Sequence, residues 1–105
     1  MARVRPNEDV TMAVEAVAAA CGWSDAVVRG SLGSLVGASF ADGRVVGDLA
    51  TEVFIRDGAV RDGVACLDLA VVDMAGQVWD GVLAWGANAV LITFDLLVEG
   101  VWAGK

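Results

Sequence analysis

The sequence contains no histidine and no tyrosine, and its 105 residues include one proline and two cysteines. Without histidine, the chain lacks the side chain that most often carries protons near neutral pH and that most often binds metals. Basic residues are also scarce: seven Lys and Arg stand against fourteen Asp and Glu, which gives a formal net charge of -7. This charge repels a phosphate backbone, whose binding depends on clustered cations. We therefore expect no direct binding to nucleic acid.

Long hydrophobic runs are absent as well. The longest uncharged stretch, Gly81 to Phe94, is interrupted by glycine and by Asn88 and is shorter than the ~20 residues that cross a bilayer. The first residues do not form the apolar core of a signal peptide. We expect a cytoplasmic protein with no membrane partner, in which Cys21 and Cys66 are reduced thiols.

The composition is nevertheless apolar: 57% of the residues are hydrophobic and 20% are charged. A chain of this length forms one modest core, so we expect a single domain over residues 1–105. This apolar content also predicts that part of the surface is buried against another subunit.

One amphipathic helix is predicted near the N-terminus. Apolar side chains recur there at helical spacing: Val10, Val14, Val17 and Cys21. We expect a helix over 8–21, capped by Asn7 and ended by Gly22, with Cys21 in the core.

Short β-rich runs follow the helix. They cover 26–29, 34–40, 44–49, 51–56, 64–72, 77–84 and 89–98. Turns are predicted at 41–43, at Asp57-Gly58 and at 74–76, because each supplies a residue that accepts positive φ. The expected fold class is therefore α+β: an antiparallel-rich mixed sheet of six to seven strands with a helix packed on it.

Five short segments of the chain follow the order and spacing of a known family. They are Pro6-Asn7-Glu8-Asp9-Val10; Gly33-Ser34-Leu35 with Ala38; Glu52 with Gly58; Asp73 with Gly76, Val78, Gly81 and Leu83; and Gly86 with Thr93-Phe94-Asp95. Together they resemble the plants-and-prokaryotes conserved (PPC) domain. The resemblance implies an antiparallel-rich sheet covered by a helix and, commonly, a homotrimer.

The chain departs from this family where many prokaryotic members carry three histidines that resemble a metal site. Those positions are Cys66, Asp68 and Val82 here. Thiolate and carboxylate both bind zinc, but two ligands of a four-coordinate site are missing, so we expect no metal and no other cofactor. A pocket that survives without its metal remains an alternative. Cys66 is not expected to act as a nucleophile, because forming the thiolate needs a base or a cation, and the chain has no histidine and offers only Asp68 nearby in sequence.

Asp68 itself lies within a strand whose other members are apolar. Alternation places it on the same face as Cys66, away from Leu67 and Leu69. We expect Asp68 to line a cleft between subunits and to accept a hydrogen bond there in place of a metal.

Other side chains are candidates for the same cleft. Arg29 would meet an anionic ligand or an acid on another subunit. Glu52 and Asp95 would form an acid–base pair, or would be solvated charges or form salt bridges with Arg29 or Arg56. Trp79 would stack on a ligand or pack in a core or interface. The full candidate set is Arg29, Glu52, Cys66, Asp68, Trp79, Val82 and Asp95.

Two functions are compatible with these features. The first is a non-catalytic oligomerisation and interaction or ligand-binding domain, homotrimeric, whose partners are its own copies and another protein or a small molecule. The alternative is a small-molecule-binding protein or metal-assisted enzyme with sites at subunit clefts. The missing histidines favour the first, and we expect no catalysis.

Overall fold

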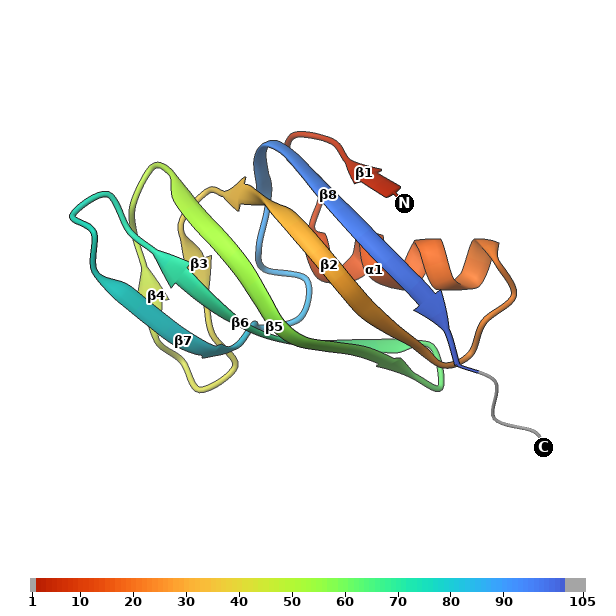
Figure 1. Cartoon of the computed structure of the whole chain (residues 1–105). Coiled ribbons are helices and arrows are strands. Elements are labelled where there is room, and N and C mark those ends of the chain that lie inside the picture. Colours follow the sequence, from red (N-terminus) through yellow and green to blue (C-terminus); the bar gives the residue numbers. More distant parts are fainter. Residues whose placement is uncertain (1, 102–105) are drawn as a thin grey trace.

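A computed structural model describes residues 2–101 as one helix and eight strands (Figure 1). In chain order, these are β1 (Ala2–Val4), α1 (Val10–Ala20), β2 (Ala26–Leu35), β3 (Ala38–Ser39), β4 (Val45–Val46), β5 (Thr51–Arg61), β6 (Val64–Val72), β7 (Val78–Val82) and β8 (Val90–Gly100).

Six of these strands form one sheet in the order β1-β8-β2-β5-β6-β7, and every neighbouring pair is antiparallel. The short strands β3 and β4 form a separate hairpin beside β7. The helix α1 packs on one face of the sheet, against β6 and β8 in particular (Figure 1). This architecture confirms the predicted α+β class, with a helix on an antiparallel sheet.

The helix begins two residues later than predicted. Asp9 is the N-cap, and its carboxylate accepts the backbone N–H of Met12 at 2.8 Å. Asn7 is not the cap: it adopts a left-handed conformation, with φ of 68°, in the turn that leads into the helix. The predicted end is correct, because Gly22 has a φ of 75° directly after the C-cap Cys21.

The buried stripe of α1 is rotated from the predicted one. Val10, Thr11, Val14 and Ala18 are buried, whereas Cys21 is exposed. The expectation that Cys21 lies in the core is therefore wrong, because the helix ends before it and the core-facing row continues through Ala18 instead.

The hairpin of β5 and β6 turns at a different place from the predicted one. Asp57-Gly58 lies inside β5, where a register shift between Ile55 and Asp57 accommodates an extra residue. The chain reverses instead at Asp62-Gly63, whose φ values of 51° and 80° are those of a tight hairpin turn.

Strand β2 is likewise continuous where the sequence predicts a break after 29. Register shifts between Val28 and Gly30 and between Gly33 and Leu35 carry the strand through its glycines. The predicted strand 34–40 is divided between the end of β2 and the two-residue β3, and the predicted strand 44–49 is reduced to the two-residue β4. The predicted turn joins β3 to β4.

The core lies between α1 and the sheet. Its largest fully buried apolar side chains are Phe94, Leu35, Leu67, Leu69 and Leu96. Phe94 on β8 covers Gly33 on β2 so closely that a Cβ at Gly33 would lie 2.6 Å from the ring. This close approach explains why the strand carries glycine there.

A buried asparagine joins the helix start to the end of the β3 strand. Asn88 is 2% exposed. Its side chain accepts Ser39 N at 2.7 Å and donates to the carbonyls of Ser39 and Ala84 at 3.0 Å. Its backbone N–H donates to the Asp9 carboxylate at 2.7 Å. The connection between β7 and β8 is thereby fixed against the N-terminus of α1.

No helix within residues 2–101 is long and apolar enough to span a bilayer.

The contact between Gly33 and Phe94 predicts a large difference between two glycine-to-alanine variants. Gly33→Ala should lower the free energy of unfolding by about 1–3 kcal/mol, because the new methyl group overpacks the core. Gly47→Ala is the matched control, since a Cβ at Gly47 meets nothing within 4 Å. It should change stability by no more than about 0.5 kcal/mol. Urea denaturation measures both, and equal effects would contradict the prediction.

Candidate functional site

The face of the sheet turned away from α1, here called the outer face, carries the predicted site positions. Alternation along β6 buries Leu67 and Leu69 and places Cys66 and Asp68 on the outer face, as predicted. Val82 on β7 lies directly opposite Asp68 in the ladder. The structure therefore brings together the three positions Cys66, Asp68 and Val82.

These three side chains line a shallow, partly open pocket of about 240 Å³. Its other lining residues are Asp57, Ala59 and Arg61 from β5. Asp57 is opposite Asp68, and Ala59 is opposite Cys66. The pocket thus combines two carboxylates, a guanidinium and a thiol over a small apolar base.

The carboxylate of Asp68 is engaged by Arg56. Nη2 of Arg56 lies 2.6 Å from Oδ1 of Asp68, and its Nη1 lies 3.4 Å from Oδ2 of Asp80. The hydrogen bond to Asp68 raises the pKa of the Arg56 guanidinium. Asp68 therefore accepts a hydrogen bond, as expected, and the donor is a cation that spans β5, β6 and β7. That Asp68 lies between subunits remains a prediction.

The sequence analysis names both Arg56 and Asp68 but does not predict that they pair with each other. The pairing follows only when the β5–β6 turn is placed at Asp62-Gly63, because this register sets Asp57 opposite Asp68. With the turn at Gly58, Arg56 would lie beside the turn and far from Asp68. The Asp-Gly pair at 62–63 was the available signal.

The donor set does not fit a metal of the zinc type. Cys66 and Asp68 supply one thiolate and one carboxylate, Val82 supplies no donor, and the guanidinium of Arg56 already bonds to the carboxylate. Across residues 2–101, no three Cys, Asp or Glu side chains gather closely enough to hold a metal ion.

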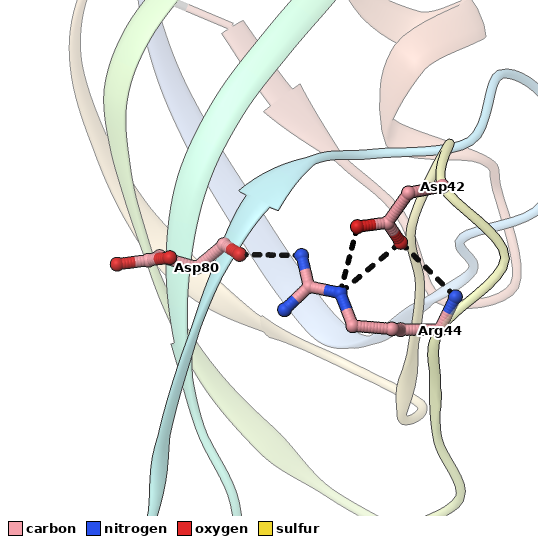
Figure 2. Close-up of polar contacts among 3 residues, drawn as sticks. All are labelled: Asp42, Arg44 and Asp80. Carbon is pink, nitrogen blue, oxygen red and sulfur yellow. Dashed lines mark hydrogen bonds and ion pairs between the residues drawn. The ribbon is translucent and has the colours of Figure 1, made fainter.

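Asp80 is held from its other side by Arg44 (Figure 2). Nη2 of Arg44 donates to the Asp80 carbonyl at 2.7 Å, and its Nε donates to the Asp42 carboxylate at 2.8 Å. The guanidinium also lies 4.6 Å above the ring of Phe40. Figure 2 shows the Asp80 carboxylate pointing away from Arg44, which leaves it free to meet Arg56. The two arginines together fix β7, and with it Val82, beside the pocket.

Arg29 and Asp95 lie on the outer face but outside the pocket. Arg29 pairs with Glu99 of its own chain at 2.8 Å. Asp95 pairs with Arg3 on β1 at 2.8 Å, and not with Arg29 or Arg56 as the sequence suggested. The hydrogen bonds from Arg3 lower the pKa of the Asp95 carboxyl. The sequence could not indicate this pair, because β1 was not predicted as a strand.

Glu52 and Trp79 are also separate from the pocket. Glu52 is exposed near the start of β5, opposite Ser34 and Val72. Trp79 points to the opposite side of β7 from Val82 and packs against the core. Its indole Nε1 donates to the carboxylate of Asp73 at 2.9 Å. Of the two roles predicted for Trp79, the structure therefore shows packing against the core and not stacking on a ligand in the pocket.

Asp73 organises the turn between β6 and β7. One carboxylate oxygen accepts the backbone N–H groups of Ala75 and Gln77 at 2.9 and 2.8 Å. Gly76, with a φ of 82°, completes the turn. The hydrogen bond from Trp79, together with these backbone bonds, lowers the pKa of the Asp73 carboxyl. These contacts explain why Asp73 is followed, three residues later, by Gly76 in the segment that resembles the PPC domain.

Several solved structures share the fold of this chain. A hypothetical protein from Salmonella enterica superposes with a TM-score of 0.78 at 24% identity, over 95% of this chain and 75% of that one. A plant- and prokaryote-conserved (PPC) protein from Pyrococcus horikoshii gives 0.72 at 14%, over 99% and 78%. A metal-containing protein from Archaeoglobus fulgidus gives 0.59 at 16%, over 94% and 78%. No protein-family model and no curated protein matches the sequence.

The fold is therefore that of the PPC proteins, as the sequence resemblance implied. One structure with this fold is described as metal-containing. In this chain, Cys66, Asp68 and Val82, the positions where the sequence resemblance places the family's histidines, offer an incomplete donor set.

The lowered pKa of Asp73 predicts a pH-dependent effect of Asp73→Asn. A carboxyl with a depressed folded-state pKa stabilises the fold above its unfolded pKa of about 3.9, and this stabilisation is lost as the pH falls through the folded value. The variant should therefore melt at a lower temperature than the wild type at pH 7. The gap should narrow below about pH 4. Thermal melts across pH 2–7 measure this, and a gap that stays constant would contradict it.

The incomplete donor set predicts that zinc does not bind stoichiometrically. After incubation with zinc and desalting, elemental analysis should find well below one ion per chain. Replacing Cys66, Asp68 and Val82 together by histidine should raise the zinc content towards one ion per chain. A wild-type content near one ion per chain would overturn this interpretation and favour a metal-assisted enzyme.

Proposed function

We propose that the protein is a non-catalytic assembly module that forms a homotrimer through its outer face and binds a protein or small molecule at the clefts between subunits. The observation that carries this proposal is the exposed apolar surface of the outer face. Its exposed apolar side chains are Leu32, Phe54, Val72, Val78, Val82 and Leu97.

These side chains come from five adjacent strands, β8, β2, β5, β6 and β7, and share one face. Phe54 lies opposite Ala70, and Val72 lies opposite Val78, so the apolar positions continue from β5 to β7. Phe54 is 64% exposed and Leu32 is 72% exposed. Monomeric proteins rarely leave large apolar side chains together on one face, and such patches typically mark interfaces.

The charges of the outer face favour contact with a second copy. Arg3, Arg29 and Arg56 are each paired with an acid of the same chain. These pairs lie around the apolar side chains and lower the local charge. Two copies of a chain with a net charge of -7 can therefore approach through this face with less repulsion than through other surfaces.

The number of copies rests on the PPC resemblance, which implies a trimer. A ring of three also suits a contact in which two different parts of one face meet, because head-to-tail contacts close into rings.

The pocket beside Asp68 favours a second candidate, the binding of a small polar molecule. Its two carboxylates and the guanidinium of Arg61 offer both acceptors and donors. Catalysis is not favoured by the same groups. Asp68 is engaged by Arg56, and Cys66 has only carboxylates and no histidine as a neighbouring base.

The proposal predicts a trimer that one outer-face substitution dissociates. Light scattering at micromolar concentration should give three times the mass of one chain. Phe54→Asp should give the mass of one chain, because it places a charge at the centre of the apolar surface. Leu49→Asp is the matched control: Leu49 is 72% exposed, and it lies in the connection between β4 and β5. That variant should stay trimeric, and a monomeric wild type would refute the proposal.

A further inference from the structure

A glycine on the outer face opens a hollow between β2 and β8. The hollow has a volume of about 290 Å³, and Gly30, Ser31, Leu32, Asp95 and Leu97 line it. The register shift after Val28 turns Gly30 to the outer face, opposite Leu97. Because Gly30 has no side chain, the surface is recessed at this point between two leucines.

Nothing within the subunit requires glycine at position 30. Its φ lies outside the left-handed region, and an added Cβ would meet only the Cβ of Leu97, at an ordinary 3.8 Å. Gly33 differs, since a Cβ there would collide with Phe94. Strand glycines are common at bulges and where another group approaches closely, and Gly30 follows the register shift at Val28. Since its backbone conformation would accept a side chain, the recess that it leaves is available to another group.

Phe54 projects from the same face beside this hollow. The backbone N–H of Ile55 donates to the hydroxyl of Ser31 at 3.1 Å, which sets Phe54 on β5 next to Leu32 on β2. A hollow of about 290 Å³ is larger than the ~150 Å³ apolar cavity that holds benzene, so it can accept a phenyl ring. The face therefore carries both an aromatic projection and a recess that fits one.

We infer that Phe54 of one copy inserts into the Gly30 hollow of the next copy. This inference rests on the proposed assembly and specifies the contact that forms it. The projection and the hollow are different parts of the same surface, so each copy uses Phe54 towards one neighbour and the hollow towards the other, and the contacts close into a ring. At the rim, Asp95 is paired with Arg3, so the entering ring meets no uncompensated charge.

Filling the hollow tests the contact. Gly30→Leu should leave the fold intact, as judged by circular dichroism, and should raise the dissociation constant of the assembly about ten-fold or more, because the new side chain occupies the place of Phe54. Gly47→Leu is the control for a leucine at an unobstructed glycine, and it should assemble like the wild type.

Phe54→Ala gives an independent route, because shortening an exposed side chain does not disturb the core. It should weaken the assembly by a similar factor, and adding Gly30→Leu to it should weaken the assembly no further, since both changes remove one contact. Additive losses would overturn the inference, as would wild-type assembly of both single variants.

The outcomes separate this inference from the proposed function. A monomeric wild type would overturn both and leave the outer face to a different partner. A trimeric wild type whose Gly30 and Phe54 variants also remain trimeric would overturn only the contact between Phe54 and Gly30.

Discussion

A single helix can cover only one face of this sheet, and the rest of the structure depends on that limit. The 11 residues of α1 extend about 16 Å, whereas the 11 residues of β5 extend about 36 Å. The helix, together with the β3–β4 hairpin and the connection fixed by Asn88, therefore encloses one core on one side of the sheet. The opposite side keeps apolar side chains that no further element within residues 2–101 covers.

The sequence predicted the features that depend on local alternation and on turns with one clear signal. The two faces of β6, the turn at Asp73 and the end of α1 at Gly22 are correct, because each follows from neighbours within a few residues. The resemblance singled out Cys66, Asp68 and Val82. The structure sets Asp68 opposite Val82 and places all three around one pocket, whereas their role as a site remains a prediction.

The errors arise where contacts distant in sequence decide the local structure. Asp57-Gly58 has the composition of a turn, yet Gly58 lies in β5 where Val28 and Leu67 pack so closely that a Cβ would be 3.0 Å from Val28. Because the sequence predicted the turn at Asp57-Gly58, it did not predict that Arg56 pairs with Asp68. The buried row of α1 includes the polar Thr11, because its hydroxyl bonds to Asp9 and to the backbone of Gly86, which lies far along the chain.

The hydrogen bonds of Arg44 have a consequence for how the sheet can grow. β7 is an edge strand of the sheet, and the unpaired backbone groups of an edge strand can pair with a strand of another chain. Here the Asp80 carbonyl is bound by the Arg44 side chain, and the Val82 carbonyl accepts the backbone N–H of Ala41 at 2.8 Å. The opposite edge strand, β1, is only three residues long. Both edges are thereby poorly suited to pairing with another strand. The proposed assembly would therefore use the face of the sheet, which gives a closed particle and not a continuous fibre.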